Sequence, residues 1–432
     1  MQTDHYMVEL SFRGKLSAAE HQNNNQVAPK FSKPSEYQWK QYNDFIHSRV
    51  SLAHGDLDID QFAKTLMTAA EIYLSKDTVP RKKDYLSHRT WSLISDRQEL
   101  FTQGLSDEAK AQDRQIKKEA RADKRRHIIN QFHHAPGDPF RKKTWKVVHQ
   151  LRSDFKPSYV AMRDSYGRRV PLPKRAETIA EYLFSKHWSN EAGNGPLPFQ
   201  DNIGDPLNCD PTPFTAEELD MVLKNSKSNK QPGPDHMPME LFKWLNRCNR
   251  SPLLSILNNW WTQGEVPQEI LHARVVPIFK KGNIDDPSNY RPISLLNSIY
   301  KIFTSLARGR IQSAVEHKVS PTQSGFRPGK STAHATFIIR RLQDWSEQKN
   351  TDLYLALLDW EKAFDKVQHC KLVEAMDRLG FSRHFLKVIK SLYNSPTFFV
   401  QDQYGASAQK TQLTGIRQGC PLSPYLFLFV MT

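Results

Sequence analysis

A short apolar run in the last fifth of the chain has the length of a buried strand. It extends from Leu353 to Leu358, too short for a buried helix, and Asp359 follows it directly. The pattern therefore predicts a strand with a lone carboxylate at its carboxyl end, the edge where ligands bind in α/β folds.

The first part of the chain shows helical spacing instead. Apolar residues recur with a helical period over 37–75, and a Ser-rich start before an apolar pattern predicts a helix over 86–94. A longer helical segment reaches Phe132 and concentrates cations, and residues 140–151 are predicted to continue it. A solvated helix and an RNA-binding helix explain this basic segment equally well. Its cations are Lys117, Lys118, Arg121, Lys124, Arg125 and Arg126.

Composition divides the chain into five parts. Residues 13–36 and 187–213 are polar, lack periodicity and are predicted linkers. The second linker ends before a helix whose start has capping-box spacing from Thr215 to Glu218. The predicted parts are 1–12, linker 13–36, a basic helical connecting region 37–186, linker 187–213, and a globular part 214–432 with its core motifs in 275–432.

The carboxylate at Asp359 is a candidate metal ligand. Hard divalent ions such as Mg²⁺ take carboxylate oxygens and commonly share their remaining positions with substrate phosphates. Taken alone, an Asp after a strand is more often a helix cap or a turn residue.

A Gly-rich loop about fifty residues later changes that balance. Residues 415–424 place two glycines, Arg417 and Gln418 ahead of an apolar helix. A turn with Ser423 at the helix start explains the glycines and prolines. It does not explain Arg417 and Gln418, whereas a loop that approaches a ligand closely would.

Three further blocks precede these two, and each sets a basic residue beside a turn. They cover 275–282, 289–297 and 323–332. In this order, the five blocks resemble the reverse transcriptase domain of non-LTR (LINE-type) retrotransposons, and residues 230–238 resemble that family's entry to the fingers. The resemblance covers about half of the chain.

The resemblance implies a fold and a reaction. The fold would be α/β (α+β), the fingers and incomplete palm of a right-hand polymerase, preceded by the basic, mostly helical region. Expected palm strands lie near 353–358, 397–403 and 409–413, and expected helices near 370–379 and 382–393. The partners would be an RNA template, a DNA primer and deoxynucleotides, and the cofactor Mg²⁺, with Mn²⁺ as the alternative.

Individual residues take the roles that the resemblance assigns. Asp359 matches the catalytic, metal-binding aspartate, and Phe364 the aromatic that excludes a nucleotide 2′-hydroxyl. Lys280 and Arg291 match basic residues that hold nucleotide phosphates, work that suits their donors. Asp365 belongs to the Asp359 signature without an assigned role. Gln418 and Gly419 match the loop that contacts nucleotide and template.

The second acidic motif of the family, Tyr or Phe, any residue, then Asp-Asp, would follow the helix that begins at Ser423, but the sequence ends at Thr432. Two metal ions need several carboxylates, so this chain alone is expected to be an inactive fragment of an RNA-directed DNA polymerase. The alternative is a polymerase-derived nucleic-acid-binding protein, or a decayed remnant, that does not catalyse.

The amino terminus carries a weaker signal. Asp4 and His5 head a strand-like stretch that resembles the last motif of the apurinic-endonuclease-like domain found before many LINE-type polymerases. In that domain the Asp orients a His acid/base group. A solvent-exposed pair at a chain terminus explains the dipeptide equally well.

Charge and cysteine content agree with an intracellular, nucleic-acid-binding protein. The formal net charge is +15 and the pI about 9.5, which favours a polyanionic partner. The four cysteines are widely separated, so neither a zinc site nor a disulfide framework is predicted. The sequence shows no apolar run long enough for a membrane span. The family implies nucleus and cytoplasm, and the oligomeric state stays open.

Overall fold

The computed structural model describes residues 29–51, 58–75, 85–102, 106–133, 162–189 and 206–431. The chain forms two compact units, one of residues 75–160 and one of residues 1–74 and 161–432. This division cuts the range 37–186 that composition predicts as a single connecting region. Asp4, His5 and the predicted helix at 140–151 lie outside the described residues.

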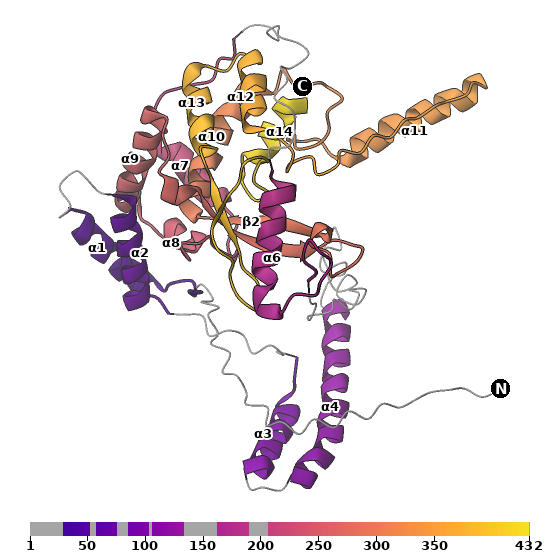
Figure 1. Cartoon of the computed structure of the whole chain (residues 1–432). Helices are drawn as coiled ribbons and strands as arrows, with labels where there is room; N and C mark the ends of the chain where they lie inside the picture. The colour runs from indigo at the N-terminus through magenta and orange to yellow at the C-terminus, as the bar shows by residue number, and fades with distance from the viewer. Residues whose placement is uncertain are drawn as a thin grey trace. The chain divides into compact units, whose positions relative to one another are not determined.

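The smaller unit contains a hairpin of two helices, α3 (His88–Thr102) and α4 (Ser106–His133), which Figure 1 shows side by side. Asp123 of α4 is buried and accepts hydrogen bonds from residues at the start of α3. Its Oδ2 accepts hydrogen bonds from the Ser87 backbone N–H (2.8 Å), Ser87 Oγ (2.8 Å) and Thr90 Oγ1 (2.6 Å). The unpaired N–H groups of the α3 start are thus partly satisfied from the neighbouring helix.

The larger unit contains a four-stranded sheet in the order β2-β1-β3-β4. Its strands are β1 (His272–Phe279), β2 (Tyr290–Leu296), β3 (Thr397–Val400) and β4 (Lys410–Thr411). β1 pairs antiparallel with β2 and parallel with β3, and β3 pairs antiparallel with β4. Buried residues alternate along β2 and β3, as expected for strands with one face on a core.

The same unit contains eleven described α-helices. They are α1 (Glu36–Ser51), α2 (Ile59–Tyr73), α6 (Arg175–Tyr182), α7 (Ala216–Asn225), α8 (Met239–Lys243), α9 (Arg247–Gln263), α10 (Ser298–Val315), α11 (Thr332–Lys349), α12 (His369–Arg378), α13 (Arg383–Leu392) and α14 (Ser423–Met431). Short 3₁₀-helices are η1 (Leu172–Lys174), η3 (Gln268–Leu271) and η4 (Pro287–Asn289), and η2 (Leu183–His187) is a short π-helix. The capping box from Thr215 to Glu218 forms as the sequence predicts.

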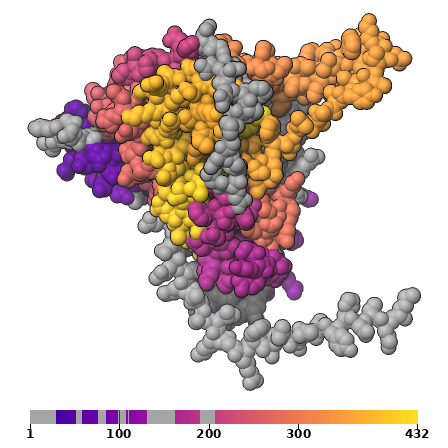
Figure 2. All heavy atoms as spheres, turned by 45° about the horizontal axis from the view of Figure 1, so that its top comes forward, coloured from indigo at the N-terminus to yellow at the C-terminus, as the bar shows by residue number. Residues whose placement is uncertain are grey.

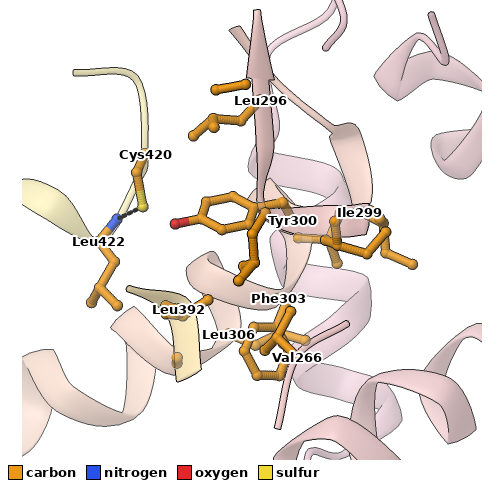
Figure 3. Packing of buried hydrophobic residues seen from close by; sticks show 14 of the residues in the cluster. Val266, Leu296, Ile299, Tyr300, Phe303, Leu306, Leu392, Cys420 and Leu422 are labelled. Atoms are coloured by element: carbon orange, nitrogen blue, oxygen red, sulfur yellow. Dashed lines mark hydrogen bonds between the residues drawn. The ribbon is translucent and has the colours of Figure 1, made fainter. Parts of the chain in front are cut away.

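One core joins most of these elements. Figure 3 shows Tyr300 and Phe303 of α10 packed among Val266, Leu306 and Leu392. The Tyr300 ring points toward Cys420 and Leu422, so the segment before α14 is part of this core. The Leu422 backbone N–H lies 3.4 Å from Cys420 Sγ.

Helices α1, α2 and α6, which precede residue 190, belong to this core. Tyr42 of α1 donates a hydrogen bond to the Leu241 carbonyl of α8 (3.1 Å), and α6 packs on β3. Lys410 of β4 forms ion pairs with Glu177 (3.2 Å) and Glu181 (2.7 Å) of α6. Helices α1, α2 and α6 therefore share one folded body with the elements that follow the predicted linker 187–213.

The α/β fold class is confirmed, and so are most predicted elements of the palm. Helices α12 and α13 match the predictions near 370–379 and 382–393, and β3 and β4 are shorter than the predicted strands at 397–403 and 409–413. Within the described residues, no helix is both long and apolar enough to cross a membrane. The cysteines Cys209, Cys248, Cys370 and Cys420 are all free.

The predicted strand at 353–358 is wrong. These residues pair with no strand of the described sheet, and Leu357 and Leu358 are 87% and 89% exposed. A strand forms only where a neighbour accepts its backbone hydrogen bonds, and apolar content alone does not supply one.

Candidate functional site

Two glycines let the loop before α14 approach the rest of the fold closely. Gly419 has φ +138°, and a Cβ atom there would lie 2.3 Å from the Ser294 carbonyl oxygen of β2. Gly415 has φ +86°, and its Cβ would lie 2.8 Å from the Asp365 carbonyl oxygen. Both positions therefore require glycine, for conformation and for space.

Backbone hydrogen bonds fix this loop on two sides. The Ser294 N–H of β2 donates to the Gln418 carbonyl (2.9 Å). On the other side, the Ile416 N–H donates to the Phe364 carbonyl (2.8 Å) and the Gly415 N–H to the Val367 carbonyl (2.7 Å). These hydrogen bonds connect the predicted nucleotide-binding loop both to β2 and to the segment that follows Asp359.

Asp365 anchors the side chain of Gln418. The carboxylate is buried, and its two oxygens accept hydrogen bonds from Trp188 Nε1 (3.1 Å) and Gln418 Nε2 (2.7 Å). His187 Nε2 lies 3.1 Å from Asp365 Oδ2. The carboxamide of Gln418 is therefore held in one orientation, and we conclude that Asp365 is a positioning residue of the loop.

Sequence reasoning missed His187 and Trp188, which it placed at the start of a linker. Trp188 is almost fully buried, and its ring lies edge-on against Phe398 of β3 with centroids 4.7 Å apart. A His-Trp pair at the end of an apolar helical stretch is the signal that could have found them, since large aromatics bury much area.

Arg417 is buried and anchors the loop before α14. A simple turn before the helix does not account for this residue. Only 1% of it is exposed; its Nη2 donates to the Leu271 carbonyl, and its guanidinium lies 5.6 Å from the Tyr300 ring centroid. Burial raises the pKa of Tyr300 well above its usual range, so the ring stays neutral under the cation.

Phe364 lies between aromatic side chains of two other segments. Its ring stacks on Phe427 of α14 (centroids 5.0 Å apart) and lies edge-on to Phe326 (5.8 Å). The predicted 2′-hydroxyl-excluding aromatic is thus held in a fixed position beside the anchored loop.

Lys280 and Arg291 lie at one end of the β1–β2 hairpin. Ile278 pairs with Arg291 in the register, and Lys280 follows two residues after Ile278. Lys280 follows the end of β1 directly, and its N–H donates to the Asn289 carbonyl (2.9 Å), so the antiparallel pairing continues and places the exposed Lys280 and Arg291 at the same end of the hairpin. The structure therefore brings this predicted pair together.

A groove of about 1130 Å³ lies between α7, β2, α10 and the loop at Gly419. Four cations line it, Lys227, Lys230, Lys301 and Arg308. Both acids in its lining are already paired, Glu218 with Arg310 (2.8 Å) and Glu316 with Arg327 (2.8 Å). The groove is therefore suited to an anion.

Lys301 lines this groove and interacts electrostatically with the buried carboxyl of Asp235. Burial raises the pKa of the Asp235 carboxyl to about 6. The hydrogen bond from the Met237 N–H acts in the opposite direction, because it stabilises the charged carboxylate, but its effect is smaller. Burial lowers the pKa of the Lys301 amine, and the negative charge of Asp235 opposes this effect by raising it. Each therefore favours its neutral form more than a solvated group does.

The structure does not bring Asp359 into contact with the loop at Gln418. It is exposed, on the unpaired segment after Leu358, and it takes part in no hydrogen bond or ion pair found among the described residues. Its neighbouring acids are engaged, Asp365 with Trp188 and Gln418, and Glu361 with Lys366 (3.2 Å). The described part of the chain holds no cluster of three side chains that could bind a metal ion.

Comparison with known proteins agrees with this geometry. Residues 278–432 match the family of reverse transcriptases (RNA-dependent DNA polymerases), and the matched range includes β2, Phe364 and the Gln418 loop. This part of the chain is therefore similar to reverse transcriptases.

Named relatives narrow the class. The chain is 32% identical over 216 residues to the transposon TX1 uncharacterized 149 kDa protein of Xenopus laevis, covering 50% of this chain and 16% of that protein. It is 27% identical over 221 residues to the Pol polyprotein of the type-1 retrotransposable element R2 of Popillia japonica (51% and 30%). It is 28% identical over 296 residues to the RNA-directed DNA polymerase from mobile element jockey of Drosophila funebris (66% and 32%).

These relatives support the class predicted from the motifs, the reverse transcriptases of non-LTR retrotransposons. The chain spans between 16% and 32% of the length of these three relatives.

Proposed function

We propose that residues 214–432 act in RNA-directed DNA synthesis for a non-LTR retrotransposon, as part of a longer protein. The observation that carries this proposal is the loop at Gln418 and Gly419, held by Asp365 and β2 at the edge of a basic groove. The proposed partners are an RNA template, a DNA primer and deoxynucleotides. The proposed location is intracellular, in nucleus and cytoplasm.

Each residue has a defined task in this proposal. Lys280 and Arg291 bind the triphosphate from the end of the hairpin, the Gln418 loop contacts the incoming nucleotide and template, and Phe364 excludes a ribose 2′-hydroxyl. These tasks use charge, a fixed amide and a fixed ring, so the chain's contribution is mainly positioning and electrostatics.

The proposed metal ion is Mg²⁺, with Mn²⁺ as the alternative. Reverse transcriptases generally use divalent metals, and the exposed carboxylate of Asp359 is the kind of oxygen donor that these ions prefer. When bound, the ions would neutralise charge on the attacking and leaving oxygens. Because Glu361 and Asp365 are engaged elsewhere, the remaining ligands would come from other carboxylates.

Primer extension tests this proposal. Expressed within the longest reading frame that contains it, the chain is expected to extend a DNA primer on an RNA template with Mg²⁺ and deoxynucleotides, and Asp359→Ala to abolish extension. Residues 1–432 alone are expected to be inactive. Extension by residues 1–432 that Asp359→Ala removes would show that the fragment is competent.

A second function is favoured by the exposed, unpaired position of Asp359. It is binding of nucleic acid without catalysis, by a polymerase-derived protein or a decayed remnant. Template–primer binding by the longest reading frame, without extension under either metal ion, would support this function over the first.

A further inference from the structure

Helix α4 of the smaller unit carries a continuous stripe of cations on its exposed side. At about 100° per residue, six of them fall within about 120° of the helix circumference. All six are exposed: Arg114, Lys117, Lys118, Arg121, Lys124 and Arg125. We refer to these six residues as the α4 stripe.

The acidic residues of the same stretch lie outside the stripe and already form ion pairs with other residues. Asp113 pairs with Arg97 of α3 (2.6 Å), Glu119 with Arg89 of α3 (3.5 Å), and Asp123 with Arg126 (2.6 Å). No ion pair found among the described residues involves a member of the stripe. The stripe is therefore a face of one sign, opposite the side where Ile116 and Asp123 are buried.

Such a face is costly for an isolated helix. Lys117 and Arg121, and Arg121 and Arg125, are like-charged pairs four residues apart, and each destabilises a helix by about 0.2–0.5 kcal/mol. A solvated helix normally interleaves acids to avoid this cost. A bound polyanion would remove the repulsion, which gives the arrangement a physical reason.

The dimensions fit the backbone of a nucleic acid. From Arg114 to Arg125 the helix rises about 16 Å at 1.5 Å per residue. One strand of a duplex carries about five phosphates over that length, at about 3.4 Å each. Six flexible cations in a straight line can therefore meet a comparable number of phosphates.

We infer that the α4 stripe is a binding surface for the phosphate backbone of nucleic acid, separate from the groove of the larger unit. This inference goes beyond the proposed polymerase function because it requires neither nucleotide nor metal ion. Direct backbone contact without base contacts predicts binding with little dependence on base sequence.

Equilibrium binding of residues 1–432 tests the inference. The probe is a fluorescein-labelled 20-nucleotide single-stranded RNA, followed by anisotropy over a range of KCl concentrations in EDTA. The variant Lys117→Gln/Arg121→Gln/Arg125→Gln keeps helix propensity and removes three charges. We expect the salt slope of log K to fall by about 2 and the affinity near 0.15 M salt to fall roughly 10- to 100-fold.

The matched control removes three exposed helical cations of the larger unit, Lys40→Gln/Lys64→Gln/Arg383→Gln. It has the same net charge and should bind within about twofold of the unchanged chain. Equal loss in both variants, or no loss in the stripe variant, would overturn the inference. Circular dichroism should show unchanged helix content in both, so that loss of binding reports on charge and not on folding.

Further probes separate the sources of phosphate. Single-stranded and duplex DNA of the same length should compete with the RNA, and their ranking identifies the preferred backbone. Phosphatidylserine vesicles that compete better than every nucleic acid would assign the stripe to a lipid surface and overturn the inference. Because this binding assay contains EDTA and no deoxynucleotide, a failed primer-extension test would not affect the result.

Discussion

Two aspartates six residues apart, Asp359 and Asp365, are held in opposite ways. Asp359 is exposed and available to a ligand, whereas Asp365 is buried and holds Trp188 and Gln418. One carboxylate is thus available for chemistry and the other for structure, although both belong to a single sequence signature.

Substitution to alanine should separate these two roles. Asp365→Ala leaves the buried donors of Trp188 and Gln418 unsatisfied and should lower the unfolding free energy by about 2–4 kcal/mol. Asp359→Ala should change it by less than about 0.5 kcal/mol. Urea unfolding measures both, and equal effects would contradict the assignment of Asp365 as the anchor.

Glycine positions give a second matched pair. Gly419→Ala places a methyl group against the Ser294 carbonyl at an unfavourable φ and should destabilise the protein by about 2 kcal/mol or more. Gly309→Ala, inside α10 with open space around it, should stabilise by about 0.5–1 kcal/mol. Thermal unfolding of the two variants should therefore shift in opposite directions.

At the scale of elements, the α3–α4 hairpin depends on Asp123. Burial acts to raise the pKa of its carboxyl, but hydrogen bonds from Thr90 and Ser87 and the charge of Arg126 lower it to about 2. A folded pKa below the unfolded value of about 4 means that its stabilisation is present above pH 4 and is lost as the pH falls toward 2.

Asp123→Ala should therefore loosen the hairpin at neutral pH by about 2–3 kcal/mol. Hydrogen exchange should show lower protection in α3 and α4, with α10 and α13 of the larger unit unchanged. The control Glu119→Ala removes only a surface ion pair and should have little effect. Unchanged protection in Asp123→Ala would refute the anchoring role.

Elements with strong local patterns could be predicted from sequence, and those that depend on partners could not. α13 buries Phe385, Leu386, Val388, Ile389 and Leu392 on one face, a spacing readable without the structure. The run 353–358 has the composition of a strand but no strand beside it. Sequence alone could not show that this pairing partner is missing. For the same reason, the link from Asp365 to Trp188, across 177 positions of chain, was missed.

At the scale of the whole molecule, apolar surface remains uncovered on α11, which extends away from its unit in Figures 1 and 2. Phe337, Ile338, Leu342 and Trp345 are all exposed, as are Leu357 and Leu358. Exposed apolar groups of this extent commonly mark an interaction surface or a site of aggregation.

We expect residues 1–432 to self-associate through this surface. Phe337→Gln/Trp345→Gln should shift the sedimentation profile toward the monomer. A matched change of two exposed apolar residues elsewhere, Ile72→Gln/Tyr166→Gln, should not. A monodisperse preparation of the unchanged chain would contradict the prediction.

The hydrogen bond between Trp188 and Asp365 also bears on where a minimal polymerase domain begins. Composition places that start at residue 214, yet Trp188 packs on β3, and α6 pairs with β4. A recombinant domain trimmed to residue 214 would expose the carboxylate that orients Gln418 and remove a helix from the sheet. A trimmed version that keeps the hydrogen bond between Trp188 and Asp365 and the packing of α6 should therefore start before η1, at the residues around Met162.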